Sequence, residues 1–164
     1  MSETQVERLA RALAAVDAPL GSMRALEPAA GILVINDAAE ATPQSTSAAL
    51  KVLAQLGLDG SRTTAVLGEL ENTDDWREDH DRIGRLVVRL NISKLVVVGE
   101  EARHIHNAAG LEGSWDGESV RVATANEAYD LVKEDLRVGD VVLVKSSAAA
   151  GLGSLGDRLG GEAA

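Results

Sequence analysis

The sequence predicts an α/β protein in which helices cover both faces of a mainly parallel β-sheet. Short aliphatic runs alternate along the chain with stretches whose apolar residues recur at helical spacing. The aliphatic runs contain almost no polar residue, which is typical of strands that are buried on both faces. Turn and capping residues separate the two kinds of segment, and 164 residues suffice for one such domain. These observations favour a Rossmann-like domain of three layers.

The first part of the chain combines a helix with an irregular segment. Leu9 and Leu13 belong to an apolar stripe at helical spacing, and Ser2 with Gln5 resembles a capping box. Glycine and proline then interrupt the pattern, although residues 23–26 fit a short strand. We therefore expect a helix and a linker ahead of the sheet.

The rest of the chain predicts five aliphatic strands separated by helices. The strands are expected at residues 32–35, 64–68, 95–99, 119–122 and 141–144. The helices are expected at 43–56, 75–90, 101–109 and 126–136, with a last short helix after residue 151. In the first of these helices Thr42 is the expected N-cap, Pro43 the first helical residue and Gly57 the end.

Composition excludes several classes of function. Aromatic residues are 2% of the chain, so stacking platforms for bases are nearly absent. The net charge of −10 has the wrong sign for a protein that follows nucleic-acid phosphates. The lack of cysteine removes disulfides, thiolate zinc sites and cysteine nucleophiles. No apolar run approaches the ~20 residues of a membrane span, and the N-terminus is not a basic signal peptide. We therefore expect a soluble, cytoplasmic and monomeric domain without nucleic-acid or membrane partners.

Candidate binding residues stand where strands end. Ligands of an open parallel sheet bind beyond the carboxyl ends of its strands. Asn36 and Asp37 follow the first aliphatic run, and Lys145 and Ser147 follow the last. A carboxylate there can accept hydrogen bonds from a ribose diol, and a lysine beside hydroxyls can bind a carboxylate or phosphate. Turn chemistry alone also explains Asn36 and Asp37, and on these residues alone it is the favoured interpretation.

Other motifs indicate structure rather than chemistry. The segment after Lys145 is not a Walker loop, and Gly99 lacks the glycines of a dinucleotide fingerprint. His80 lies on an apolar helix face and is expected to be packed, while His104 and His106 diverge on a helix. An acidic group is expected to be a solvated loop and helix start, with a weak cation site as the alternative. That group comprises Glu69, Glu71, Asp74, Asp75, Glu78 and Asp79. We predict no catalytic residue and no metal site.

A distinctive series of short motifs runs along the chain. It consists of Gly31-Ile-Leu-Val-Ile-Asn36-Asp37-Ala38, Pro43, Val66-Leu67-Gly68-Glu69, His80-Asp-Arg-Ile-Gly84, Val97-Val98-Gly99 and Arg137-Val-Gly139-Asp140-Val-Val-Leu-Val-Lys145. In this combination the chain resembles the C-terminal domain of the Mur ligases of peptidoglycan synthesis, of the actinobacterial type that adds D-alanyl-D-alanine. The resemblance implies five parallel strands and one antiparallel strand near Met23. It also implies that residues 1–22 end the central ligase domain, that residues 23–160 form the C-terminal domain, and that residues 161–164 are a tail.

In that family the C-terminal domain closes over ATP and helps to bind D-alanyl-D-alanine. ATP and Mg²⁺ serve the intact enzyme, which activates a peptide carboxyl group as an acyl phosphate. The resemblance assigns Asp37 to the nucleotide ribose, with Asn36 supporting that turn, and places Lys145 and Ser147 near the substrate or phosphates. The remaining Mur-ligase domains are the expected partners. Because the chain has no Walker loop, we expect no ligation by this chain alone. If it is a substrate-closing ligase domain, weak binding of ATP and D-alanyl-D-alanine is expected.

The sequence departs from the family at the proposed binding rim. Where the family typically reads Asn-Asp-Ala-Tyr-Asn-Ala-Asn-Pro, this chain has Ala39, Glu40 and Thr42 in place of an aromatic residue and two amides. A polar segment around Glu71 replaces apolar residues, and Ala148 stands where the family usually carries Arg or Asn. Two hypotheses follow: a substrate-closing ligase domain, or a non-catalytic degenerate or redesigned scaffold with a disabled nucleotide site. The clustering of the changes slightly favours the scaffold.

Overall fold

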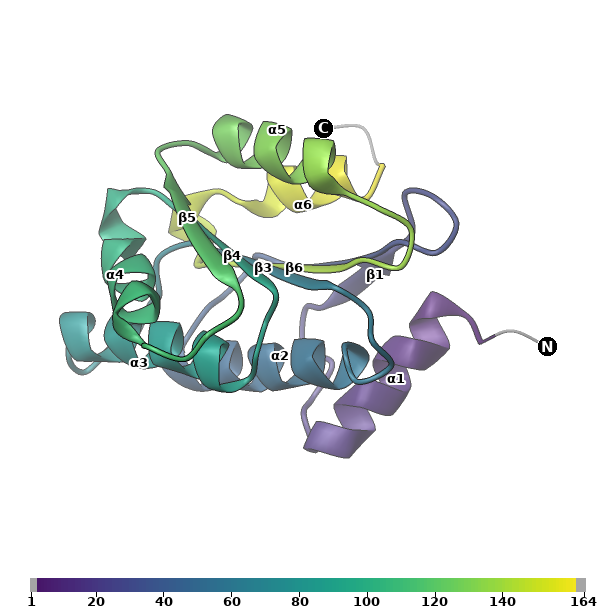
Figure 1. Ribbon diagram of the computed structural model, residues 1–164, viewed down its shortest axis with the longest axis horizontal. Helices are drawn as coiled ribbons and strands as arrows, with labels where there is room; N and C mark the ends of the chain where they lie inside the picture. Colours follow the sequence, from purple (N-terminus) through teal and green to yellow (C-terminus); the bar gives the residue numbers. More distant parts are fainter. Residues whose placement is uncertain (1–2, 162–164) are drawn as a thin grey trace.

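The alternating pattern folds into a six-stranded sheet between two layers of helices (Figure 1). The computed structural model describes residues 3–161. In chain order the elements are α1 (Gln5–Val16), β1 (Arg24–Leu26), β2 (Leu33–Asp37), α2 (Pro43–Leu56), β3 (Thr63–Leu67), α3 (Trp76–Arg89), β4 (Lys94–Val98), the 3₁₀ turn η1 (Glu100–Ala102), α4 (Arg103–Leu111), β5 (Glu118–Val122), α5 (Ala125–Asp135), β6 (Val141–Lys145), the 3₁₀ turn η2 (Ala148–Ala150) and α6 (Gly153–Leu159). Within residues 3–161 no helix is long and apolar enough to cross a membrane.

The strands lie in the order β1-β2-β6-β3-β4-β5. β1 runs antiparallel to β2, whereas every other neighbouring pair is parallel. The predicted fold, a Rossmann-like sheet that is mostly parallel with one antiparallel strand, is therefore confirmed. The last strand in the chain, β6, lies between β2 and β3, so their three carboxyl ends are neighbours.

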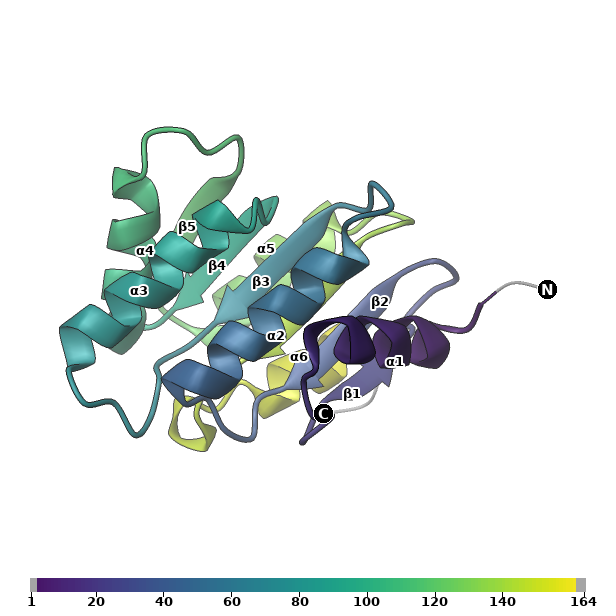
Figure 2. The same ribbon diagram turned by 90° about the horizontal axis from the view of Figure 1, so that it is seen from below.

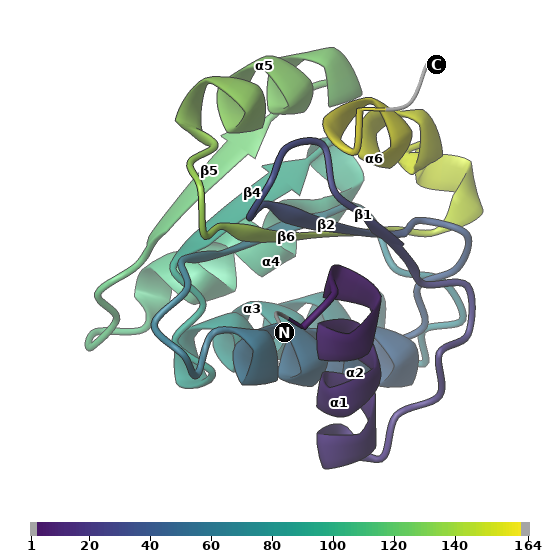
Figure 3. The same cartoon turned by 90° about the vertical axis from the view of Figure 1, so that its right-hand side faces the viewer.

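Each face of the sheet supports its own apolar core. Successive side chains of a strand point to opposite faces. Leu33 and Ile35 accordingly pack against α1–α4, while Val34 packs with α5 and α6. Figures 1 and 3 show α1–α4 on one side of the sheet and α5 with α6 on the other. All five residues of β2, β3 and β6 are buried, as their aliphatic composition predicts.

Capping residues fix where the first two helices begin. Thr42 caps α2 as predicted, because its Oγ1 accepts a hydrogen bond of 3.0 Å from the Ser45 amide and Pro43 is the first helical residue. In α1 the capping box is formed by Thr4 and Glu7 instead of Ser2 and Gln5. Gln5 is itself the first helical residue and cannot occupy the third position that a capping box needs. Ser2 lies outside the described residues.

Helix α1 lies beside α2, on the side of β1 and β2 (Figure 2). Its buried residues, Leu9, Ala12 and Leu13, belong to the same core cluster as the apolar residues of α2. Burying a leucine side chain contributes about 1.5–3 kcal/mol, so these contacts outweigh the helix's own marginal stability. Val6, by contrast, is 65% exposed.

An ion-pair network closes the amino edge of the sheet. Arg62, just before β3, donates through Nε to Asp140 at 3.0 Å and through a terminal nitrogen to Asp135 at 3.1 Å. The hydrogen bond with Asp140 raises the pKa of Arg62, although burial opposes this effect. Because Asp140 precedes β6 and Asp135 ends α5, one guanidinium group ties three elements together at the edge opposite the carboxyl ends of the parallel strands.

Candidate functional site

Asp37 and Lys145 form a buried ion pair at the carboxyl edge of the sheet. They are the last residues of β2 and β6, and the strand register places them directly opposite each other. Nζ of Lys145 lies 2.7 Å from Oδ2 of Asp37, and the two side chains are only 2% and 5% exposed. The parallel pairing therefore brings together two of the predicted site residues, which are 108 positions apart in the chain.

The ion pair is completed by two groups from neighbouring loops. Oγ of Ser22, in the linker between α1 and β1, donates to Oδ1 of Asp37 at 2.7 Å. Nζ of Lys145 also donates to the backbone carbonyl of Glu40 at 2.9 Å. Both oxygens of the Asp37 carboxylate thus have donors. Because removing one partner of a buried pair costs about 3–5 kcal/mol, the network has a structural role whatever it binds.

A cavity of about 250 Å³ lies beside this ion pair. Asp37 and Lys145 line it together with the linker segment 19–23 and the N-terminal part of α2, including Gln44 and Ala48. Small-molecule pockets usually measure about 300–1,000 Å³, so this one has room for part of a nucleotide rather than a whole one. A charged pair at one side and apolar walls from Leu20, Met23 and Ala48 suit a sugar or a base.

Asn36 points to the other face of the sheet. Its Nδ2 donates to the Gly153 carbonyl at 3.0 Å and to Oδ1 of Asp157 at 2.8 Å, both in α6. Its Oδ1 is buried without a hydrogen-bond partner among the described residues. Adjacent side chains of a strand point to opposite faces of the sheet, so the side chains of Asn36 and Asp37 lie on different faces. Asn36 therefore holds α6 against the end of β2.

Ser147 is buried just beyond β6 and is not among the residues that line the cavity beside Asp37. Its backbone amide donates to the Glu69 carbonyl at 3.0 Å, which joins the loops after β6 and β3. Within the described chain its hydroxyl is buried and has no partner. Of the two residues that the resemblance places near the substrate or phosphates, Lys145 lines this cavity and Ser147 does not.

The loop between β2 and α2 is held by residues at which the sequence departs from the family pattern. Oε1 of Glu71 accepts from the Ala41 amide at 2.9 Å, and the Glu71 amide donates to the Ala41 carbonyl at 2.9 Å. Thr42 and Ser45 form a reciprocal capping box at the start of α2. These contacts satisfy amides that would otherwise be free to bind an anion at this helix N-terminus.

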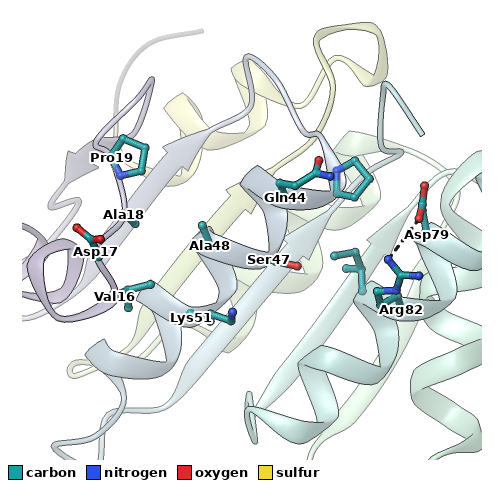
Figure 4. Close-up of a pocket in the computed structure, with 12 residues that line it drawn as sticks. Val16, Asp17, Ala18, Pro19, Gln44, Ser47, Ala48, Lys51, Asp79 and Arg82 are labelled. Carbon is teal, nitrogen blue, oxygen red and sulfur yellow. Dashed lines mark ion pairs between the residues drawn. The ribbon is translucent and has the colours of Figure 1, made fainter. Parts of the chain in front are cut away.

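A second hollow, of about 380 Å³, adjoins the first (Figure 4). The two share Pro19, Gln44 and Ala48. Figure 4 shows Lys51 on α2, with the linker on one side and Asp79 and Arg82 of α3 on the other. The lining contains Lys51 and Arg82 as well as Asp17 and Asp79, so basic and acidic side chains are balanced. Together the two hollows extend along the first turns of α2.

His80 is packed, as predicted, and both His80 and His106 make internal hydrogen bonds. The Trp76 carbonyl accepts from Nδ1 of His80 at 2.7 Å, so Nε2 is the atom that accepts from the Leu70 amide at 3.1 Å. Burial lowers the pKa of His80, and the hydrogen bond to Trp76 partly opposes this. Nδ1 of His106 lies 2.6 Å from Oγ of Ser119. Residues 3–161 hold no cluster of three or more potential metal ligands, including the acidic group after β3.

Sequence reasoning missed two partners of the ion pair. Ser22 lies in an irregular linker, and its polarity alone does not distinguish it from any solvent-exposed serine. Glu40 contributes its backbone carbonyl, which its residue type cannot reveal. The detectable signal was Gly21 beside Ser22, since glycine and serine are both common in turns.

Comparison with known proteins shows similarity over almost the whole chain. Residues 23–148 match the family described as "Mur ligase, glutamate ligase domain". The chain is 42% identical over 175 residues to the UDP-N-acetylmuramoyl-tripeptide–D-alanyl-D-alanine ligase of Mycobacterium leprae, covering 97% of this chain and 34% of the relative. The ligase of the same name from Mycobacterium tuberculosis strain H37Rv is 42% identical over 172 residues, covering 94% of this chain and 34% of the relative. The chain thus spans about a third of the length of these relatives.

Solved structures show the same fold. MurF from Acinetobacter baumannii superposes with a TM-score of 0.69 at 25% identity, covering 84% of this chain and 30% of that one. MurF ligase from Thermotoga maritima, solved in complex with ADP, superposes with a TM-score of 0.66 at 16% identity. That similarity covers 92% of this chain and 35% of the Thermotoga chain, and at this identity it concerns the fold alone.

Proposed function

The chain belongs to the Mur ligase family, and we propose that it acts as the C-terminal domain of a ligase that joins D-alanyl-D-alanine to a UDP-N-acetylmuramoyl-tripeptide. In this role it contributes one wall of the ATP site, while other domains of the ligase supply the remaining walls. Residues 1–22 then correspond to the end of the preceding domain, and residues 23–160 to the C-terminal domain itself.

The observation that carries this proposal is the Asp37–Lys145 pair beside a cavity, in a chain 42% identical to ligases of that name. A carboxylate accepts hydrogen bonds from ribose hydroxyls. The size of the cavity and its apolar walls suit the nucleoside end of ATP. When bound, ATP supplies the phosphoryl group that activates a carboxyl group.

The chain alone is not expected to catalyse ligation. Phosphoryl transfer depends on positioned phosphates, Mg²⁺ and a phosphate-binding loop, and this sequence contains no Walker loop. Its expected partners are therefore the other ligase domains. Binding of ATP and D-alanyl-D-alanine by the isolated chain is expected to be weak, and its location in the cytoplasm stays a prediction.

A domain exchange tests the proposal. The matching third of the Mycobacterium leprae ligase is replaced by this chain, and ATP-dependent ligation of D-alanyl-D-alanine is measured. We expect an active hybrid in which Asp37→Asn raises the KM for ATP more than that for the dipeptide. Lys133→Met, on α5, is the control.

The isolated chain provides a second readout that does not depend on activity. Amide resonances around Asp37 and Lys145 should shift when millimolar ATP with Mg²⁺ or millimolar D-alanyl-D-alanine is added. An inactive hybrid that folds normally, together with unmoved resonances, would contradict the proposal.

One observation favours the scaffold as a second candidate. Thr42 and Glu71, which stand where the family carries other residues, use their side chains for internal contacts in the β2–α2 loop. If these changes disable the site, the variant Ala39→Tyr/Glu40→Asn/Thr42→Asn should bind ATP more tightly than the present sequence. Equal affinity, measured by calorimetry on both proteins, would argue against a site disabled by substitution.

A further inference from the structure

Ser22 occupies one of the two acceptor oxygens of Asp37. Its hydroxyl lies 2.7 Å from Oδ1, while Lys145 is bound to Oδ2. Asp37 is 5% exposed, so a ligand cannot reach Oδ1 while Ser22 stays in place. The contact is a hydroxyl donating to a carboxylate, which is also the contact that a sugar hydroxyl of a ligand would make.

Ser22 is carried by a short turn, residues 19–23, which we call the strap. The Met23 amide donates to the Leu20 carbonyl at 3.1 Å, and Gly21 has a φ of 55°. A positive φ at the second residue of a four-residue turn favours glycine, so the turn is well suited to this sequence. Every residue of the strap lines the cavity beside Asp37.

Four of the five residues of the strap are exposed. Its outer residue, Leu20, is 53% exposed, whereas Met23 is 8% exposed and packs into the core beneath the turn. Pro19, Gly21 and Ser22 are also exposed. The hydrogen bond from Ser22 to Asp37 is therefore the polar anchor of the strap, and Met23, directly before β1, is its apolar anchor.

We propose that Ser22 is an internal substitute for a ligand hydroxyl, and that the strap must lift before a nucleotide can contact Asp37. The proposal rests on the proposed function for the identity of the ligand. The strap is then in equilibrium between a closed form and a lifted form, and only the lifted form binds the ligand. The apparent affinity is therefore the affinity of the lifted form multiplied by the fraction of protein that is lifted. Since the strap connects α1 to β1, binding at Asp37 and the placement of α1 become coupled.

Removing the anchor should favour the ligand. A hydrogen bond to an ionised group is stronger than one between neutral groups, although solvent weakens it at an exposed serine. We therefore expect Ser22→Ala to bind ATP about three- to tenfold more tightly than the unmodified chain, measured by calorimetry with Mg²⁺. Ser22→Thr keeps the hydroxyl and should bind within about twofold of the unmodified chain. Equal affinities of Ser22→Ala and the unmodified chain would overturn the proposal.

A second measurement follows the strap without any ligand. The sequence has no cysteine, so Met23→Cys introduces a single thiol beneath the turn. Its rate of alkylation by iodoacetamide should rise about three- to tenfold when Ser22→Ala is added, because the lifted form is then more populated. Leu20→Cys, at a position already exposed, should react at the same rate with either residue at position 22.

The two measurements separate the strap from the proposed function. If no variant binds ATP at millimolar concentration, the expected ATP binding by the isolated chain fails, the hybrid ligase decides on the proposed function, and the alkylation rates alone decide on the strap. Faster alkylation of Met23→Cys with Ser22→Ala then supports the strap as a movable cover over Asp37. An unchanged rate, in protein whose unfolding transition shows it to be folded, would overturn it.

Discussion

At the scale of single residues, the buried pair of Asp37 and Lys145 gives the clearest energetic expectation. Lys145→Met leaves a buried carboxylate with Ser22 as its remaining donor, and we expect a loss of about 3–5 kcal/mol in the free energy of unfolding. Urea denaturation followed by tryptophan fluorescence measures this loss. Lys51→Met, at an exposed lysine, should change the value by less than about 0.5 kcal/mol.

A double variant distinguishes a charge effect from a packing effect. Asp37→Leu/Lys145→Met removes both charges, so part of the stability lost in Lys145→Met should return. The single variants Asp37→Leu and Lys145→Met are measured for comparison. If the double variant loses more stability than the two single variants together, altered packing around the ion pair, and not an unpaired charge, explains the losses.

His80 predicts a loss of stability in mild acid. Burial lowers its pKa in the folded chain, so below the unfolded value of about 6.5 the unfolded state binds the proton more readily. Stability is then fully present above about pH 6.5 and declines as the pH falls toward the folded pKa. His80→Gln should flatten the dependence of the unfolding free energy between pH 7 and 5. An equally steep dependence in that variant would assign the effect to other groups, such as His106, whose pKa burial also lowers.

The residues of the site were only partly predictable from the sequence. Asp37 and Lys145 end aliphatic strands, and the rule for open parallel sheets then places them at one edge. The opposite directions of Asn36 and Asp37 follow from the twofold repeat of a strand, but which one faces the cavity depends on the helix that covers each face. Ser22 reaches Asp37 through a turn, and the path of a turn depends on contacts distant in sequence.

At the scale of elements, the contact between α3 and α4 is closer than ordinary helix packing. A Cβ added to Gly84 would lie 2.2 Å from the Ile105 carbonyl oxygen. We expect Gly84→Ala to lower the free energy of unfolding by about 1–3 kcal/mol, because the helices must separate. Gly110→Ala on α4 meets nothing within 4 Å, so there alanine should stabilise the chain by about 0.5–1 kcal/mol. Thermal unfolding of the two variants, with opposite shifts expected, checks the prediction.

The positions of helices and strands follow closely from sequence patterns. Aliphatic runs located β2, β3, β4, β5 and β6 to within two residues, because fully buried strands have a distinct composition. The predicted N-cap of α1 was wrong because two overlapping pairs of polar residues both resemble a capping box: Ser2 with Gln5, and Thr4 with Glu7. The position of β6 between β2 and β3 has no local signal, since it results from where α5 returns the chain.

At the scale of the whole molecule, the two ends of the sheet differ in purpose. Arg62 closes the amino edge, whereas the carboxyl edge carries the cavity. Arg62→Met should lower the free energy of unfolding by about 1–2 kcal/mol, since the network is partly exposed to solvent. Amide resonances near Asp37 should stay in place. Shifts there would show that the two edges are coupled through the sheet.

The outermost strand also affects how the domain behaves in concentrated solution. Among residues 3–161 no strand pairs with the far side of β5, and an unpaired strand edge is a template for aggregation. Glu118 and Arg121 are exposed on this strand, and each has an ion-pair partner on or beside β4. Pairing a strand of another molecule along this edge would strip water from these charges. We therefore expect solutions concentrated enough for titration with weak ligands to remain clear, with no growth of cross-β fibrils.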